Sequence, residues 1–231
     1  MPTSGDPGPD LFAVPQSGKK AEAPLAERMR PREFADFVGQ DEIVGTDRPL
    51  RKAIESDRLS SVIFWGPPGS GKTTLAHLIA RHTKAHFVAF SAVTGGIPEL
   101  REIIKAAEHQ LALQQQKTVL FVDEIHRFNK AQQDAFLPHV ERGTVILVGA
   151  TTENPSFEVI SPLMSRSILV VLKSLSDEAL GQILDRAQTD SDVGLGQLKA
   201  RLSPGARQRL IAIGNGDARA LLTATEFVVT Q

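Results

Sequence analysis

The sequence predicts an α/β domain built around a parallel sheet, followed by a small all-helical domain. Three observations predict this fold class. Five short apolar runs alternate with helical patterns between residues 62 and 172, which is typical of a parallel sheet covered by helices on both faces. A glycine-rich loop joins the first apolar run to the helix that follows it. Beyond residue 172 every periodic segment is helical.

The elements of the predicted sheet domain can be assigned in order along the chain. The apolar runs are short enough to be buried strands, and the longer segments repeat apolar residues at intervals of three and four. The predicted strands are Val62–Trp65, His86–Phe90, Val119–Val122, Val145–Val148 and Ile168–Leu172. The predicted helices are Pro49–Asp57, Lys72–Thr83, Pro98–Gln116 and Lys130–Glu141. Pro138 is expected to kink the last helix or to remove one of its hydrogen bonds.

The remaining segments complete a three-part organisation. Ser176, followed by two acidic residues, indicates a helix start, and further helices fit Pro204–Ile213 and Asp217–Val229. Residues rich in Pro, Gly, Ser and Ala open the chain and are expected to form a flexible tail. The predicted parts are the tail at 1–23, the core at 24–173 and the helical domain at 174–231.

One apolar island interrupts the predicted tail, at Asp10-Leu11-Phe12. It is either a chance apolar pair, which we favour, or a short docking peptide for a partner.

The composition excludes several classes of protein. The 231 residues include 26 basic and 27 acidic ones, so a net charge of −1 predicts neither a nucleic-acid coat nor a membrane-surface protein. Any DNA contact must therefore come from a local patch. The absence of cysteine excludes a disulfide scaffold, a thiol nucleophile and a thiolate zinc site. No membrane span and no secretory signal is predicted. His77 and His82 share one predicted helix but are five apart, which is not the spacing of a ligand pair, so the six histidines, His126 among them, are expected to have solvent or packing roles and no zinc.

The strongest functional signal is the loop Gly66–Thr73, which matches G-x-x-x-x-G-K-[ST] in full between a strand and a helix. Its glycines let backbone N–H groups converge on phosphate oxygens, and the helix N-terminus adds partial positive charge. Lys72 should reach the β- and γ-phosphates of ATP, and the Thr73 hydroxyl should hold Mg²⁺. The residues expected to contact the nucleotide are Gly66, Pro67, Pro68, Gly69, Ser70, Gly71, Lys72, Thr73 and Thr74.

A second signal is the pair Asp123-Glu124, which ends an apolar strand about 50 residues after the loop. Asp123 should orient Mg²⁺ through water, and Glu124 should act as general base on the attacking water. Two surface acids that cap the next helix are the alternative, which the loop Gly66–Thr73 disfavours.

Polar residues also follow the strand Val145–Val148. Strand tips of a parallel sheet line the ligand crevice, so Thr152 is a candidate to bond the attacking water or the γ-phosphate, with Asn154 as the fallback. A simple polar turn is an equally good interpretation. Arg166 and Arg219 are isolated basic residues, and most such arginines are solvated or form surface pairs.

The order of these motifs resembles the AAA+ superfamily of ATPases. The segment Arg30–Gln40 is similar to the one that cradles adenine in clamp loaders and in the RuvB branch-migration motor, which implies Val38 and Gly39 as nucleotide contacts. Gly66–Thr73 resembles Walker A and Asp123-Glu124 resembles Walker B.

The same resemblance gives the three isolated polar residues roles by position. It implies Thr152 as sensor 1, Arg166 as the arginine finger that acts on a neighbouring subunit, and Arg219 as sensor 2 in a helical lid. All three would then be catalytic, together with Lys72 and the acidic pair.

Longer strings are similar to one branch, the replication-associated recombination protein A family and its eukaryotic relative, the Werner-helicase-interacting ATPase. These strings are Phe121–Asp134, Gly149–Phe157 and Ser91–Gly95, and RuvB shares the first only through Arg127. Ser165-Arg166-Ser167 departs from the clamp-loader Ser-Arg-Cys but keeps the arginine. Family members continue into a C-terminal helical domain that drives oligomerisation, so the chain is expected to be a fragment or a truncated form.

This family resemblance implies an ATP- and Mg²⁺-dependent motor ATPase that acts on DNA in replication-fork maintenance, recombination and repair. The implied partners are DNA forks, gaps or ends, further copies of the ATPase domain, and a single-strand DNA-binding protein or sliding clamp, but no membrane. The implied location is the cytoplasm, at the nucleoid.

Two alternatives remain open at this point. One is a clamp-loader-like or RuvB-like subunit for Holliday-junction branch migration. The other is a non-hydrolysing adaptor switched by nucleotide, against which Glu124, Arg166 and Arg219 argue. The string Asp-Glu-Ile-His also suggests a DExH helicase, which Arg219 and the segment Arg30–Gln40 disfavour.

Overall fold

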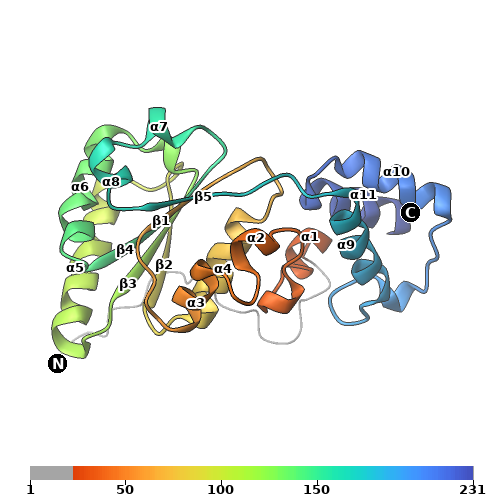
Figure 1. The fold of residues 1–231 in the computed structure, drawn as a ribbon, viewed down its shortest axis with the longest axis horizontal. Coiled ribbons are helices and arrows are strands. Elements are labelled where there is room, and N and C mark those ends of the chain that lie inside the picture. The colour runs from red at the N-terminus through yellow and green to blue at the C-terminus, as the bar shows by residue number, and fades with distance from the viewer. Residues whose placement is uncertain (1–22, 231) are drawn as a thin grey trace, which may run out of the picture.

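Five parallel strands form the central sheet of this computed structural model, which describes residues 23–230 (Figure 1). The strand order is β2-β3-β4-β1-β5. The strands are β1 (Val62–Trp65), β2 (His86–Ser91), β3 (Thr118–Asp123), β4 (Val145–Thr151) and β5 (Ile168–Val171). The predicted α/β fold with a parallel sheet is confirmed. The predicted tail and its island Asp10-Leu11-Phe12 lie outside the described residues.

Helices cover both faces of the sheet because side chains alternate along each strand. Phe64 belongs to the apolar cluster on one face and its neighbour Ile63 to the cluster on the other. The first cluster includes residues of α3 (Pro49–Glu55) and α4 (Lys72–His82). The second includes residues of α5 (Ile97–Gln114) and α6 (Lys130–Glu141).

Two strands differ from their prediction in an informative way. β4 extends three residues beyond Val148, because it is paired on both sides and the missing side chain of Gly149 leaves room for Ile125, which a Cβ would meet at 3.1 Å. β5 is an edge strand rather than a covered one, with Ile168 57% and Val171 49% exposed. The other predicted element ends either coincide with those observed or differ by one or two residues. α6 runs on through Pro138 to its end at Glu141.

Several very short helices were not predicted, because three or four residues are too few to show a periodicity. They are α1 (Leu25–Arg28), η1 (Phe34–Asp36), α2 (Asp41–Val44), η2 (Ile125–Arg127), α7 (Pro155–Glu158), α8 (Ser161–Met164) and η3 (Gly196–Leu198).

Three longer helices follow β5 and form a separate unit beside the sheet (Figure 1). Ser176 caps the first, as predicted, and its side chain accepts a hydrogen bond from the Ala179 N–H at 3.2 Å. The core of this helical unit includes Leu180, Leu210 and Leu221. The helices are α9 (Asp177–Thr189), α10 (Pro204–Gly214) and α11 (Ala218–Thr230).

The helix α1 packs on the helical unit although it precedes the sheet in sequence. Leu25 and Met29 share an apolar cluster with Leu222 of α11, and Arg28 forms an ion pair with Glu226 at 3.2 Å. The segment after α1 then returns to the sheet, so residues 24–38 bridge the two units (Figure 1).

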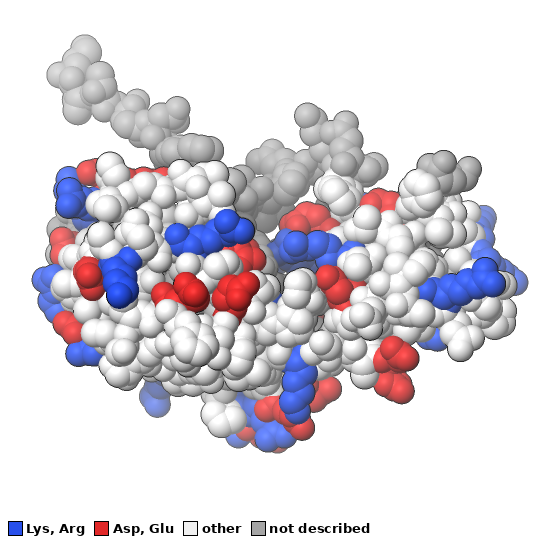
Figure 2. All heavy atoms as spheres, turned by 90° about the horizontal axis from the view of Figure 1, so that it is seen from above, with Lys and Arg blue, Asp and Glu red and all other residues white. Residues whose placement is uncertain are grey.

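The surface carries both signs of charge. Figure 2 shows acidic and basic side chains side by side on one face, without a continuous coat of either sign. Across residues 23–230, no helix is long and apolar enough to cross a membrane.

Candidate active site

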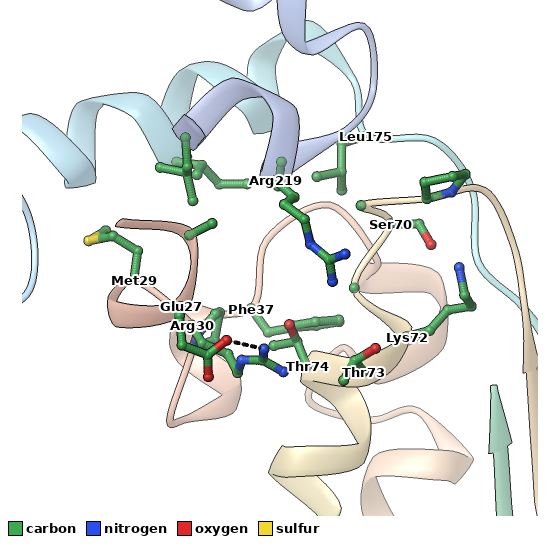
Figure 3. Close-up of a pocket in the computed structure, with 18 of the residues that line it drawn as sticks. Glu27, Met29, Arg30, Phe37, Ser70, Lys72, Thr73, Thr74, Leu175 and Arg219 are labelled. Carbon is green, nitrogen blue, oxygen red and sulfur yellow. Dashed lines mark hydrogen bonds and ion pairs between the residues drawn. The ribbon is translucent and has the colours of Figure 1, made fainter. Parts of the chain in front are cut away.

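A cavity of about 590 Å³ lies where the sheet and the helical unit meet. Its walls come from the loop before α4, the ends of β3 and β4, the bridging segment 24–38, and the helices α9 and α11 (Figure 3). The cavity therefore opens at the carboxyl ends of the parallel strands, where open α/β sheets bind their ligands.

The glycines of the loop Gly66–Thr73 allow its tight path. Gly69 has a φ of +65° and Gly71 a φ of +104°, a region that residues with a side chain rarely adopt. A Cβ on Gly71 would also lie 2.8 Å from the Phe37 ring. The loop leads directly into α4, whose first residues line the cavity, and a helix N-terminus favours an anion. Within the described residues the Ser70 hydroxyl is buried and has no hydrogen-bond partner, which leaves it available to a ligand.

Lys72 is almost fully buried within the fold of this loop. Its ammonium donates to the carbonyl oxygens of Gly66 at 2.8 Å and Pro67 at 2.9 Å. Burial lowers the pKa of Lys72, and the Glu124 and Asp123 carboxylates act in the opposite direction. A nucleotide phosphate would offer this buried cation a fuller charge partner than two carbonyls do.

Thr73 and Asp123 lie together at the same end of the cavity. The Thr73 hydroxyl donates to Asp123 Oδ2 at 3.3 Å, while Asp123 Oδ1 accepts from the Glu124 N–H at 3.1 Å. A hydroxyl and a carboxylate oxygen are hard ligands of the kind that Mg²⁺ takes alongside phosphate oxygens and waters. The donor set thus fits the predicted Mg²⁺ site.

Glu124 also lines the cavity, in a left-handed backbone conformation with a φ of +53°. One of its carboxylate oxygens faces His126, whose Nδ1 lies 3.2 Å from Glu124 Oε2. A solvent or packing role was predicted for His126, and the structure places its ring against the Glu124 carboxylate. η2 is a single turn, and it brings the ring back onto the residue at its start.

The polar residues after β4 have three different environments. Thr152 lines the cavity. Thr151 is fully buried, and its hydroxyl bonds within the turn. The Asn154 side chain accepts from the Ser156 N–H at 3.0 Å and caps α7. Of the two predicted candidates, Thr152 is the one that reaches the cavity.

The two predicted arginines lie in different places. Arg219 extends from α11 into the cavity, toward the loop that carries Ser70 and Lys72 (Figure 3). Arg166 does not line the cavity; it forms an ion pair with Glu141 at 2.6 Å and donates to the Pro162 carbonyl.

The far end of the cavity is more apolar. Val38 is part of this wall, together with Met29, Ile183 and Leu222. Arg30 lies at the same end, ion-paired with Glu27 (Figure 3). The remaining predicted contacts, Gly39, Gly66 and Pro67, do not line the cavity that the described residues form.

Two residues that hold the cavity together were not predicted. Gln40 is buried, and its amide donates to the carbonyls of Lys173 at 2.7 Å and Ser70 at 3.2 Å. It thereby ties the loop to the strand-to-helix connection. Asp217 caps α11 by accepting from the Arg219 N–H at 2.7 Å, and lies against Gly69. Gln40 does stand in the predicted adenine segment, but only the fold shows what its amide bonds.

Comparisons with known proteins agree with this geometry. The ATPase family associated with various cellular activities (AAA) matches residues 62–174. "Replication-associated recombination protein A" of Haemophilus influenzae is 52% identical over 206 residues, which cover 89% of this chain and 46% of that protein. "ATPase WRNIP1" of Dictyostelium discoideum is 40% identical over 211 residues, covering 91% of this chain and 24% of that protein.

Among solved structures, the RuvB Holliday junction branch migration motor of Thermotoga maritima superposes with a TM-score of 0.68 at 28% identity. The match covers 88% of this chain and 68% of that one.

The chain spans about half the length of the curated relatives it matches at 46–52% identity. Both the sequence identity and the layout of loop, acidic pair and helical unit agree with the resemblance that the motifs indicated. Residues 62–174 match the AAA family of ATPases, and 89% of the chain is similar to the replication-associated recombination proteins A.

Proposed function

We propose that this chain binds ATP with Mg²⁺ and hydrolyses it. The observation that carries the proposal is the convergence of Lys72, Glu124 and Arg219, from the loop, the strand tip and the helical unit, on one cavity. In this proposal residues 24–173 form the ATPase core, and residues 174–231 form a lid that brings Arg219 to the nucleotide.

The phosphates lie in the loop end of the cavity. The backbone N–H groups of the loop and the α4 N-terminus bind the phosphate oxygens, and Lys72 exchanges its two carbonyl partners for the β- and γ-phosphates. Thr73 and Asp123 would hold Mg²⁺, which when bound offsets the negative charge of the phosphates.

Hydrolysis needs a base and an orienting group. Glu124 accepts a proton from the water whose oxygen attacks the γ-phosphorus, and the bond from that phosphorus to the bridging oxygen of ADP breaks. Thr152 orients the water, and Arg219 neutralises charge on the γ-phosphate. Arg166 acts on the nucleotide of a neighbouring copy, which requires self-association through the ATPase domains.

The adenine ring system of the nucleotide lies in the apolar end of the cavity. Val38, Ile183 and Leu222 offer aliphatic walls for an aromatic ring system, which gains free energy from burial. Gly39 contributes through the backbone turn that sets the position of Val38; its φ is +87°.

We also propose that the ATPase acts on DNA, at forks, gaps or ends. The support is the names of the relatives, which refer to replication and recombination, both of them processes on DNA. A single-strand DNA-binding protein or a sliding clamp is the proposed protein partner, and the nucleoid within the cytoplasm the proposed location. The mixed surface charge means that DNA contacts come from a local patch.

A RuvB-like branch-migration role has weaker support. Identity to the solved RuvB chain is 28%, against 52% to the recombination protein of H. influenzae. A non-hydrolysing adaptor would not need a carboxylate in the cavity wall, where Glu124 lies.

The test is ATP turnover of the wild type and of Glu124→Gln, each without DNA and with single-stranded, duplex and gapped DNA. The isosteric amide keeps the shape but cannot accept the proton, so turnover should fall about 10²–10⁴-fold while ATP still binds. Turnover of the variant within a factor of two of wild type would remove Glu124 as the base. Equal turnover on every DNA and without DNA would remove the proposed coupling.

A further inference from the structure

The Glu124 carboxylate has two unlike oxygens. The side chain lines the cavity, yet its Oε2 is buried and, within residues 23–230, makes no hydrogen bond. A buried carboxylate oxygen without a donor is costly, so a neighbour with a proton should serve it. The ring nitrogen Nδ1 of His126 lies 3.2 Å from this oxygen.

A second acceptor shares the same ring nitrogen. His126 Nδ1 lies 3.0 Å from the hydroxyl oxygen of Thr151. That hydroxyl donates to the Glu153 carbonyl at 3.2 Å and accepts from the Glu153 N–H at 3.0 Å. When the hydroxyl hydrogen serves the Glu153 carbonyl, Thr151 accepts from the ring, and the ring proton is then on Nδ1. Glu124 Oε2 is the second oxygen within 3.2 Å of that nitrogen.

The packing of Ile125 fixes the turn that carries the His126 ring. Ile125 is fully buried, and the missing side chain of Gly149 on β4 leaves space for it, since a Cβ there would lie 3.1 Å away. The His126 side chain itself is 16% exposed. The ring thus has little freedom to leave the space between the tips of β3 and β4.

We propose that His126 is a positioning residue for Glu124, an inference that rests on the proposed hydrolysis. Its Nδ1–H holds Glu124 Oε2, so the second oxygen stays turned to the water in the cavity. The same ring nitrogen also contacts the Thr151 hydroxyl. It thereby links the general base Glu124 to the turn that carries Thr152, the residue proposed to orient that water. A donor to an ionised acceptor makes a stronger hydrogen bond than one between neutral groups.

Three substitutions test this assignment. The amide nitrogen of His126→Asn replaces Nδ1, that of His126→Gln lies one bond further out, and His126→Phe keeps a ring without a donor. For each we measure kcat, and the Kd of a non-hydrolysable ATP analogue. The phenylalanine variant should lose part of the general-base contribution, about 10- to 100-fold in kcat, with Kd within about twofold. The asparagine variant should keep kcat within about threefold, and the glutamine variant should lie between.

His139 offers a matched control. Its Nδ1 lies 3.2 Å from Glu108 Oε1, its side chain is 15% exposed, and it does not line the cavity. His139→Phe should leave kcat unchanged. Equal losses in the asparagine and phenylalanine variants of His126, or a loss in Kd that matches the loss in kcat, would show a merely structural role and overturn the proposal. Wild-type kcat in the phenylalanine variant would overturn it as well.

The ring proton gives a readout that does not depend on turnover. The ¹⁵N shifts of His126 in the full chain should show the proton on Nδ1, and Glu124→Gln should move them, whereas the His139 shifts should stay in place. If the wild type shows no turnover, the proposed hydrolysis fails, and these shifts still decide the contact. A proton on Nε2 alone, or shifts unmoved in Glu124→Gln, would overturn the positioning role.

Discussion

The two ends of the cavity are built in different ways. The phosphate end comes from one short loop, Gly66–Thr73, and from the tip of β3, with Lys72 and Arg219 as its cations. The apolar end combines three segments that are distant in sequence: residues 24–38, α9 and α11. Neighbours along the loop shape most of the first end, to which the β3 tip adds the acidic pair and α11 adds Arg219. The docking of the helical unit shapes the second.

This difference predicts how each end contributes to binding. Charge and backbone N–H groups dominate the phosphate end, so a change there should affect every ligand with a polyphosphate. Aliphatic side chains dominate the other end, so a change there should affect only ligands with a base. Gln40 fixes the loop of the phosphate end to the strand-to-helix connection, because its amide donates to the carbonyls of Ser70 and Lys173.

The largest expected effect comes from the phosphate end. Lys72→Ala removes the cation that contacts the β- and γ-phosphates. A hydrogen bond to a charged group contributes about 1.5–3 kcal/mol and Lys72 is proposed to make two, so the Kd of ATP should rise about 100-fold or more. Isothermal titration with ATP and with inorganic triphosphate measures it, and both ligands should weaken together.

Lys52→Ala is the control for Lys72→Ala. Lys52 lies on α3, pairs with Asp47 at the surface and does not line the cavity, so its removal should leave both Kd values unchanged. ATP bound by Lys72→Ala with wild-type Kd would exclude the loop as the phosphate site.

A smaller effect is expected at the apolar end. Ile183→Ala removes methyl and methylene groups from the cavity wall, each worth up to about 0.8 kcal/mol when buried. Because Ile183 is also packed within the helical unit, only part of its surface faces the ligand. The Kd of ATP should rise about 3- to 10-fold. The Kd of inorganic triphosphate should not change.

Ile213→Ala controls for the loss of an isoleucine from the same unit. Ile213 lies on α10, is 59% exposed and does not face the cavity. Thermal unfolding of both variants checks that the helical unit is intact. Equal weakening of ATP and triphosphate by Ile183→Ala would contradict the division into a phosphate end and a base end.

The sequence predicts the sheet well because its strands are short apolar runs of the length typical of buried strands. Val62–Trp65 is observed with its predicted ends, and all five runs are strands. The misses have physical causes. β4 continues through Gly149 and Ala150, residues of low strand propensity, since pairing on both sides stabilises them. The exposure of β5 depends on the strand order, which no local pattern contains.

The residues of the candidate site likewise divide into those that a local pattern predicts and those that only tertiary contacts bring together. A contiguous motif predicts Lys72 and Thr73, because its chemistry needs those residues at fixed spacing. His126 was missed although it stands two residues after Glu124. Its contact depends on the single turn η2 and on Thr151 from the neighbouring strand. Residues 24–31 pack on α11, nearly two hundred positions later, and no local signal encodes that contact.

The smallest effect is expected outside both ends, at Arg166. Its guanidinium is bound to Glu141 and to the Pro162 carbonyl, away from the cavity of its own chain. An arginine finger contributes about 10³–10⁵-fold in related phosphate-loop enzymes, but only where it reaches a γ-phosphate. In dilute solution, where copies are apart, Arg166→Ala should therefore change turnover by less than about twofold.

Raising the chain concentration sharpens this prediction about Arg166. As copies associate, turnover per wild-type chain should rise from nanomolar to micromolar concentration, and the rise should be lost in Arg166→Ala. Arg142→Ala is the matched control, because Arg142 is a neighbouring arginine that also donates to a proline carbonyl, that of Pro138. Mixing Arg166→Ala with Glu124→Gln should restore activity, since each chain supplies the group that the other lacks. Turnover that is high and independent of concentration would mean that the finger acts within its own chain or in a preformed assembly. A finger acting within its own chain would require Arg166 to leave Glu141 and reach the cavity, and turnover of a Glu141→Gln variant should then exceed that of the wild type.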